Sequence, residues 1–218
     1  MSNVSCGICT NVLAYADDLV LCAPSWHALQ CLIDVLFSHA TSLNMTCNVH
    51  KTVCMVFAPR MKSKVVLNSF PAFCVGGTQL KFVHEFKYLG HIISCSLSDD
   101  DDIAREVRNL FVRTNILFRR FCKCSIVVKR TLFKAYCINL YDPALWRYYT
   151  ASSFNRLQSC YNKCMKIFFG YSRRYSVTQM LTELHLPSFG TVFANGCAVF
   201  TRTWFACPNT IVQYLRSI

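Results

Sequence analysis

The stretch Val12-Leu-Ala-Tyr15-Ala-Asp17-Asp18-Leu-Val-Leu-Cys22 decides how the first half of this chain folds. Two short apolar runs, rich in residues that favour strands, flank a turn of Ala-Asp-Asp. Two such runs joined by a tight polar turn predict a β-hairpin with Asp17 and Asp18 at its tip. Adjacent carboxylates repel one another unless positive charge lies beside them.

Magnesium is the cation that would suit this pair of carboxylates. Mg²⁺ prefers oxygen ligands, and two-metal sites hold the attacking and leaving oxygens in line at a phosphorus atom. Asp is also one of the commonest turn residues. The four residues Tyr15–Asp18 by themselves therefore leave a metal site and an ordinary exposed turn as open interpretations.

The residues after the hairpin predict further strands around one helix. Ser25 is the expected N-cap, and apolar residues recur at helical spacing from Leu29 to Ala40. The next expected elements are a strand at Thr52–Phe57, a hairpin around Gly76-Gly77, and a strand at Phe86–Ser94 with a break at Gly90. Residues 10–95 therefore predict an α+β layer.

Helices dominate the pattern after Ser98. Apolar stripes at helical spacing predict helices at residues 103–121, 132–140, 154–168, 177–184 and 189–204. Gly170 is the expected stop of the third of these helices. We interpret the run Asp99–Asp102 as a solvated helix start favoured by the helix dipole, rather than as a metal site. The chain is thus expected to form two domains, residues 1–97 and residues 98–218.

Charge is distributed unevenly along the chain, whose net charge is +12. Residues 103–175 carry fifteen Lys and Arg against two acidic residues, whereas residues 1–102 are slightly acidic. A basic block behind a neutral one favours a polyanionic partner for the second half. A solubility surface is the alternative, and a membrane-surface helix is disfavoured because no basic stripe lies opposite a Trp- and Leu-rich face.

The fifteen cysteines do not have the spacing of a secreted disulfide framework. They predict reduced thiols in an intracellular protein, mostly as small apolar core residues. No apolar run reaches the roughly 18–20 residues that a membrane span needs, so we expect a soluble protein with no membrane partner.

Three motifs together resemble those of a known enzyme family. Leu13-Ala-Tyr15-Ala-Asp17-Asp18 resembles the catalytic hairpin of reverse transcriptases, which has the form Tyr-X-Asp-Asp. Leu43-Asn-Met-Thr-Cys-Asn-Val-His-Lys51-Thr52 is similar to the next palm motif, and Phe86-Lys-Tyr88-Leu-Gly90-His-Ile-Ile93 is similar to the primer-grip hairpin. The form Phe-Lys-Tyr-Leu-Gly is typical of non-LTR (LINE-type) retrotransposons. With lower specificity, the resemblance extends over about residues 11–200.

The resemblance implies an α+β fold in which a partial polymerase palm of antiparallel strands and a helix precedes an all-α, thumb-like region. The chain would be a C-terminal fragment of an RNA-directed DNA polymerase. Asp17 would bind both Mg²⁺ ions and Asp18 would be an auxiliary ligand. Tyr15 would lie near the primer end and the incoming deoxynucleoside triphosphate. Lys51 would be the general acid for the pyrophosphate leaving group, or else an ordinary surface lysine.

The same resemblance implies two sets of nucleic-acid contacts, to the DNA primer and to the RNA–DNA hybrid formed with the RNA template. The primer backbone would be held by Phe86, Tyr88, Leu89 and Gly90. Phosphates of the hybrid would be neutralised by Arg105, Arg108, Arg119, Arg120, Lys123, Lys129 and Arg130.

A reverse transcriptase also needs a third carboxylate from an upstream strand, and fingers that grip nucleotide and template. The fourteen residues before Tyr15 contain no Asp or Glu. The chain is therefore expected not to polymerise by itself, unless the missing N-terminal half is supplied in trans. Two alternatives stay open: a non-catalytic basic helical module that binds nucleic acid, and an unrelated α+β protein with a coincidental Asp-Asp turn.

Overall fold

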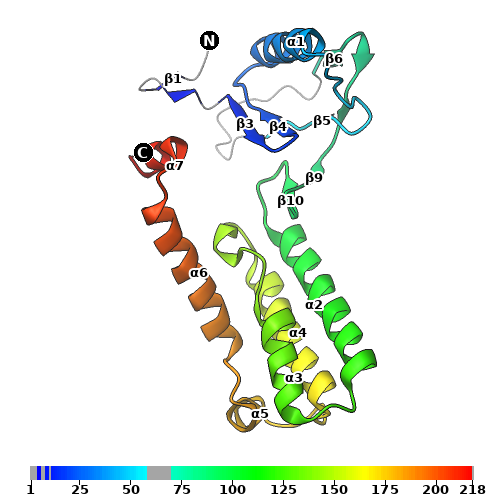
Figure 1. Ribbon diagram of the computed structural model, residues 1–218, viewed down its shortest axis with the longest axis vertical. Helices are drawn as coiled ribbons and strands as arrows, with labels where there is room; N and C mark the ends of the chain where they lie inside the picture. The colour runs from blue at the N-terminus through cyan, green and yellow to red at the C-terminus, as the bar shows by residue number, and fades with distance from the viewer. Residues whose placement is uncertain (1–3, 6–7, 10, 58–69, 218) are drawn as a thin grey trace. The chain divides into compact units, whose positions relative to one another are not determined.

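The protein is described from a computed structural model, for residues 4–5, 8–9, 11–57 and 70–217 (Figure 1). Its elements form two compact units, residues 1–85 with 207–218, and residues 86–206. The mixed α+β character expected from the sequence is confirmed. The division between the units falls at residue 85 instead of residue 97, because the hairpin after it packs on the helices.

The described strands of the first unit associate in pairs. The antiparallel pairs are β1 (Val4–Ser5) with β2 (Ile8–Cys9), β3 (Val12–Tyr15) with β4 (Asp18–Leu21), and β6 (Cys74–Val75) with β7 (Thr78–Gln79). Both predicted hairpins are confirmed. β5 (Val53–Cys54) is shorter than the predicted strand and pairs in parallel with β8 (Lys81–Phe82), which departs from the expected all-antiparallel arrangement.

One helix and a small core hold the first unit together. α1 (Trp26–Ser42) begins where Ser25 was predicted to cap it, and the Ser25 hydroxyl accepts a hydrogen bond from the amide of Ala28 at 3.3 Å. The buried core consists of Ile33, Cys54, Phe73, Val75 and Leu80. α7 (Thr210–Ser217) also belongs to this unit.

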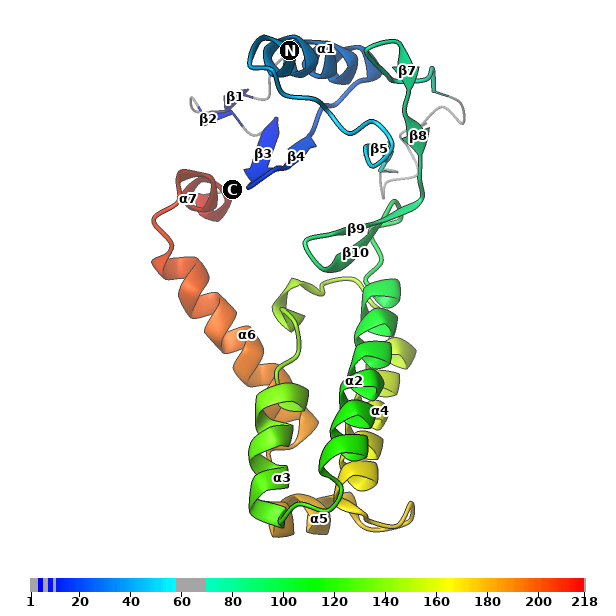
Figure 2. The ribbon, with the colours of Figure 1, turned by 45° about the vertical axis from the view of Figure 1, so that its right-hand side comes forward.

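The second unit is a helical bundle that begins with a hairpin of β9 (Glu85–Tyr88) and β10 (His91–Ser94). Its helices are α2 (Asp100–Phe121), α3 (Ile126–Phe133), α4 (Ala151–Phe169), α5 (Val177–Leu184) and α6 (Phe189–Ala206). α2, α3 and α4 run side by side, and α5 crosses one end of the bundle (Figure 2). A π-helical turn (Lys134–Ile138) follows α3, and a short 3₁₀ helix (Pro143–Leu145) precedes α4.

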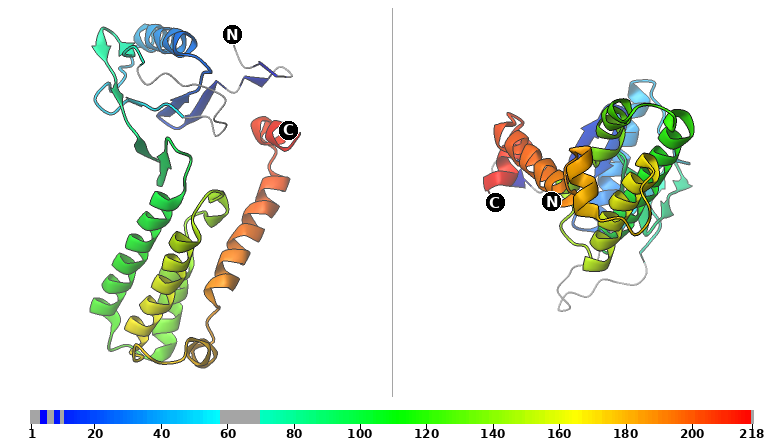
Figure 3. Two further views of the ribbon diagram at one scale, coloured as in Figure 1. Left: turned by 180° about the vertical axis from the view of Figure 1, so that it is seen from behind. Right: turned by 90° about the horizontal axis from the view of Figure 1, so that it is seen from below.

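The core of the second unit is large and aromatic. Leu110 of α2, Phe133 of α3 and Leu157 of α4 are all completely buried in it. The first half of α6 packs beside α4 (Figure 3), where the ring of Phe154 lies 5.1 Å from the ring of Phe193. Such aromatic contacts add stabilisation beyond simple burial.

Most of the helices predicted for this unit are confirmed. α5 covers the predicted residues, and Gly170 ends α4 with a left-handed φ of 81°. The prediction for residues 132–140 was wrong about the start, because the first turn of α3 exposes Ile126, Val127 and Val128. Helices are predicted from apolar residues that recur on one face, and three consecutive apolar residues do not give that spacing.

Within the described part of the chain, no helix combines the length and the apolar composition required to cross a membrane. The described cysteines carry free thiols. Four of them, Cys54, Cys137, Cys160 and Cys164, are buried core residues as expected. The remainder are partly or fully exposed, so the core interpretation was right for only a minority of them.

Candidate functional site

The turn between β3 and β4 presents two carboxylates to solvent. Tyr15 pairs with Asp18 across the end of the hairpin, which leaves Ala16 and Asp17 as the two turn residues. Asp17 and Asp18 are exposed, and neither carboxylate has an ion-pair or hydrogen-bond partner among the described residues. Tyr15 is 63% exposed beside them. The sequence prediction of a hairpin with both aspartates at its tip is confirmed.

This hairpin carries uncovered apolar surface and local strain. Val12, Leu13 and Leu19 are exposed, and they alternate between the two faces of the strand pair, so neither face is fully covered. Ala16 has a φ of 52°, the left-handed region, where a residue other than glycine costs roughly 1–2 kcal/mol. Strained turns of this kind cluster at functional sites, and uncovered apolar strands indicate an interaction surface.

Lys51 lies on an exposed turn of the same unit that is organised by Asn48. The amide of Lys51 donates to the main-chain oxygen of Asn48 at 3.1 Å and to its side-chain oxygen at 3.2 Å. The amide and the hydroxyl of Thr52 donate to the same main-chain oxygen, at 3.0 and 2.9 Å. The spacing from Asn48 to Lys51-Thr52 therefore has a structural reason, which is a hydrogen-bonded Asn turn.

The hairpin β9–β10, at the residues that resemble a primer grip, forms part of the helical unit. Leu89 and Gly90 form its turn with φ values of 45° and 90°. A Cβ atom at position 90 would lie 2.9 Å from Cε1 of Tyr141, and the Tyr141 hydroxyl donates to the carbonyl of Leu89 at 2.9 Å. Gly90 is thus required both by its backbone conformation and by the close approach of Tyr141. Phe86 is exposed and Tyr88 is half-buried.

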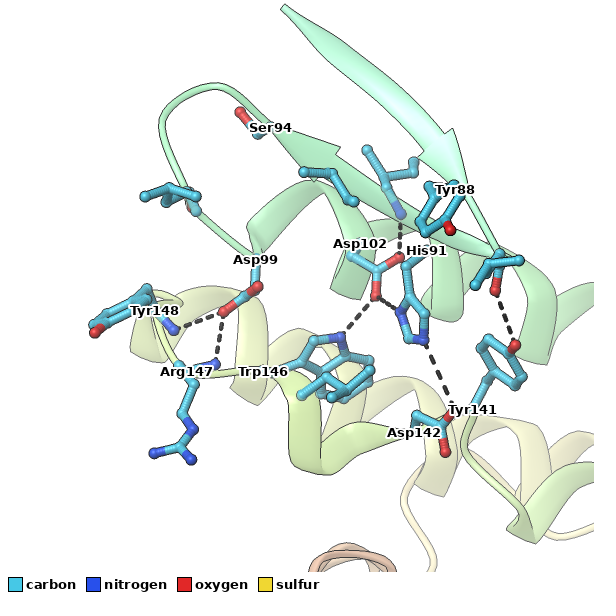
Figure 4. Close-up of a pocket in the computed structure, with 16 residues that line it drawn as sticks. Tyr88, His91, Ser94, Asp99, Asp102, Tyr141, Asp142, Trp146, Arg147 and Tyr148 are labelled. Atoms are coloured by element: carbon cyan, nitrogen blue, oxygen red, sulfur yellow. Dashed lines mark hydrogen bonds and ion pairs between the residues drawn. The ribbon is translucent and has the colours of Figure 1, made fainter. Parts of the chain in front are cut away.

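A buried carboxylate that sequence reasoning missed fixes this hairpin. Asp102, in the first turn of α2, accepts four hydrogen bonds through its two oxygens. Oδ1 accepts from the amide of Ile92 at 2.8 Å and from Nε of Arg105 at 2.6 Å. Oδ2 accepts from Nδ1 of His91 and from Nε1 of Trp146, both at 2.8 Å (Figure 4).

These hydrogen bonds decide the protonation state of the carboxyl group. Burial by itself would raise the pKa of Asp102, but the hydrogen bonds from His91, Arg105, Trp146 and the amide of Ile92 hold it well below its usual range. Asp102 is therefore ionised. It joins the strand β10, the helix α2 and the segment before α4 at one point.

We expected the acidic run at the start of α2 to be a solvated helix end, and the structure contradicts this. Asp99 accepts hydrogen bonds from the amides of Arg147 and Tyr148 at 2.7 and 2.6 Å, and Asp100 accepts one from the amide of Thr150 at 2.8 Å. That last bond lowers the pKa of Asp100. Only Asp101 is exposed, so most of the run anchors the chain segment that precedes α4.

A pocket of about 520 Å³ lies over the Asp102 network (Figure 4). Its walls come from β9–β10 with the connection to α2, and from the segment between Tyr141 and Tyr148. The lining is mainly apolar and aromatic, with Asp99, Asp142 and Arg147 as its exposed or partly exposed charges. The two carboxylates outnumber the single arginine, so this pocket is poorly suited to a polyanion.

The seven basic residues predicted to contact phosphates differ in position. Arg108, Arg119, Arg120 and Lys123 are exposed, whereas Lys129 and Arg130 are half-buried. The ammonium of Lys129 lies 5.8 Å from the ring centre of Phe168. Arg105 is buried, and its guanidinium pairs with Asp102 and with Glu106, so it serves the interior and not a phosphate surface. Arg105 is therefore not available for the phosphate contact that was predicted for it.

The burial of Asp102 had a signal in the sequence. Asp102, Glu106 and Leu110 are four residues apart and share one face of α2, and all three are buried. Carboxylates in register with the apolar stripe indicate internal ion pairs, which are here made with Arg105 and Arg113. His91, Tyr141 and Trp146 carried no comparable signal.

In the described ranges, no group of three or more His, Cys, Asp or Glu side chains is arranged to hold a metal ion. Asp17 and Asp18 remain a pair of adjacent oxygen donors. No protein-family model, curated protein or solved structure matches this chain.

Proposed function

We propose that this chain is a C-terminal part of a retrotransposon reverse transcriptase, containing the catalytic turn of the palm and a nucleic-acid-binding thumb. The observation that carries the proposal is the unpartnered pair of exposed carboxylates at Asp17 and Asp18. Other aspartates of the described chain, such as Asp99, Asp100 and Asp102, are engaged by protein donors. An adjacent pair without such partners is stabilised by bound cations.

The residues present fit magnesium. Mg²⁺ retains several waters and binds proteins through one or two carboxylates together with the phosphates of a substrate, and the exposed turn provides two carboxylates. When bound, the metal would neutralise developing charge on the phosphate of a deoxynucleoside triphosphate. Asp17 and Asp18 would hold it, and the exposed ring of Tyr15 would contact the nucleotide or the primer end.

The residues of the other two motifs have proposed roles as well. The exposed ammonium of Lys51 would donate a proton to the pyrophosphate leaving group. The tight turn at Leu89 and Gly90, with Phe86 and Tyr88 on β9, would hold the primer backbone. Both residues of that turn have positive φ, and Tyr141 fixes the turn by its hydrogen bond to Leu89.

The helical unit supplies the proposed surface for an RNA–DNA hybrid. Arg108 and Arg119 lie on one exposed face of α2, since eleven residues correspond to about three helical turns. Arg120 in the last turn of α2 and Lys123 just after its end continue the exposed positive charge. With Arg105 removed from the set, four exposed cations remain the first candidates for phosphate contacts.

Two binding measurements on the full chain test the proposal. The affinity for a labelled RNA–DNA hybrid should fall with salt, with a slope of roughly −0.9 per phosphate contact, or about −4 for four cations. Mn²⁺, used as a probe in place of Mg²⁺ and followed by electron paramagnetic resonance, should bind the wild type and bind Asp17→Ala more weakly. Asp34→Ala is the matched control, because Asp34 is an exposed carboxylate of the same unit that accepts a hydrogen bond from Gln30.

Each measurement has a contrary result. Hybrid binding that does not respond to salt removes the thumb assignment. Equal loss of Mn²⁺ binding in Asp17→Ala and Asp34→Ala removes the catalytic assignment of the turn. The chain by itself is expected not to extend a primer, and extension above an Asp17→Ala background would show that no additional segment is required.

The second candidate function is a nucleic-acid-binding module without catalysis. The observation that favours it is that the exposed cations lie in a helical unit with its own large core. Salt-sensitive hybrid binding that is unchanged by Asp17→Ala and by removal of Mg²⁺, together with no specific Mn²⁺ binding, would select this candidate.

A further inference from the structure

A second pocket of the helical unit, with a volume of about 370 Å³, is lined by residues of α2, α3 and the π-helical turn. Arg113, Ile116, Arg120 and Phe121 of α2 line one part of it, and Tyr136 of the π-helical turn lines another. The volume is within the range of sites for small ligands, roughly 300–1,000 Å³. The pocket therefore combines cationic, apolar and aromatic groups in a space that suits one small group.

The two arginines of this pocket have different surroundings. Nη2 of Arg113 lies 2.5 Å from Oε1 of Glu106, and Glu106 is completely buried. This ion pair holds the Arg113 guanidinium in place and largely compensates its charge. Arg120 is exposed and has no ion pair within the described residues. The free positive charge at this pocket therefore belongs to Arg120.

The aromatic component is Tyr136, which is 56% exposed. An aromatic ring with this exposure offers a face on which a planar group can stack. Its position on a π-helical turn is unusual, because such turns are rare and occur frequently at functional sites. None of the described residues that line the pocket is a carboxylate, in contrast to the pocket over Asp102.

From this arrangement we propose that the pocket binds one unpaired nucleotide of a nucleic acid, with its base stacked on Tyr136 and its phosphate paired with Arg120. A stacking ring beside a cation is the combination that single-stranded nucleic acids require, and stacking accepts any base. The inference rests on the proposed function, and it deepens it: the helical unit would distinguish a hybrid with a single-stranded extension from a blunt one.

The experiment uses the full chain and two labelled probes, a blunt RNA–DNA hybrid and the same hybrid with a single-stranded RNA extension of about five nucleotides. The wild type should bind the extended probe about tenfold more tightly, the effect expected of one stacked base with its phosphate contact. Tyr136→Ala and Arg120→Ala should abolish this preference. Tyr136→Phe retains the ring and should retain the preference.

Arg119→Ala is the matched control for Arg120→Ala. Both arginines are exposed neighbours on α2, and only Arg120 lines the pocket. Arg119→Ala should weaken binding of both probes alike and leave their ratio unchanged. Circular dichroism of each variant checks that the bundle is folded.

Several results would overturn the inference. If the wild type binds both probes equally, or if Arg119→Ala and Arg120→Ala change the ratio to the same extent, the pocket is not a nucleotide site, while the proposed function stands. If neither probe binds, the thumb assignment fails as well. If an acidic peptide carrying an aromatic residue displaces the extended probe at lower concentration than free single-stranded RNA does, the pocket is a protein-binding site instead.

Discussion

Replacing Asp102 by Asn should destabilise the helical unit strongly. The two side chains have the same shape, but the amide carries two hydrogens where the carboxylate has an acceptor. Whichever way the amide is turned, its NH₂ group faces at least one group that can only donate. On one side these are Nε of Arg105 and the amide of Ile92, and on the other side Nε1 of Trp146.

The size of the effect follows from burial. Asp102 is 2% exposed, and Arg105 is buried beside it. Removing one partner of a buried ion pair typically costs about 3–5 kcal/mol, because the other charge stays in the interior. That is a large part of the roughly 5–15 kcal/mol by which a domain is stable. For a unit of this size it corresponds to a fall in melting temperature of roughly 10–20 °C.

Thermal and urea unfolding followed by circular dichroism at 222 nm measure this loss. Asp101→Asn is the matched control, because Asp101 is the exposed member of the same acidic run and should change stability by less than about 0.5 kcal/mol. The double variant Asp102→Leu with Arg105→Leu should be more stable than Asp102→Leu alone, because it removes the unpaired Arg105 charge, while His91, Trp146 and the Ile92 amide lose their acceptor in both variants.

If Asp102→Asn and Asp101→Asn unfold at the same temperature, the four hydrogen bonds do not hold the hairpin on α2. A double variant that is no more stable than Asp102→Leu would show that the loss does not come from an unpaired buried charge.

Three further predictions concern pH and backbone conformation. Folding lowers the pKa of Asp102, so its ionised form stabilises the folded state fully above the unfolded pKa of about 3.9. That stabilisation is lost as the pH falls through the folded pKa. The free energy of unfolding of Asp102→Asn, measured in urea, should therefore fall less steeply with decreasing pH than that of the wild type. Ala16→Gly should stabilise the first unit by about 1 kcal/mol in urea unfolding, because it relieves the positive φ, and an unchanged or lower midpoint would contradict this. Gly90→Ala should lower the stability of the helical unit by about 1–3 kcal/mol, because a Cβ would meet Tyr141 at a positive φ. Gly190→Ala should be neutral or stabilising, because its Cβ would meet only the Ser188 hydroxyl, at an ordinary contact distance of 3.9 Å. Equal unfolding midpoints for the two variants would contradict this prediction.

Features that depend on neighbouring residues were predictable from the sequence. The N-cap at Ser25, the turn at Gly76-Gly77 and the helix stop at Gly170 all formed as predicted, because caps and turns are set by local hydrogen bonds and by the φ values that each residue allows. The hairpin tip at Asp17 and Asp18 belongs to the same class. The sequence by itself thus determined that the side chains of Asp17 and Asp18 lie at the surface of a short turn.

Features that depend on distant residues were decided only by the tertiary structure. Trp146 reaches Asp102 across 44 positions of sequence, and Tyr141 reaches Leu89 across 52. No local periodicity encodes such contacts, because they arise when the segment before α4 folds back over α2. For the same physical reason Arg105, which reads as a surface cation in the sequence, is an internal ion-pair partner in the structure: its burial depends on the chain that covers it.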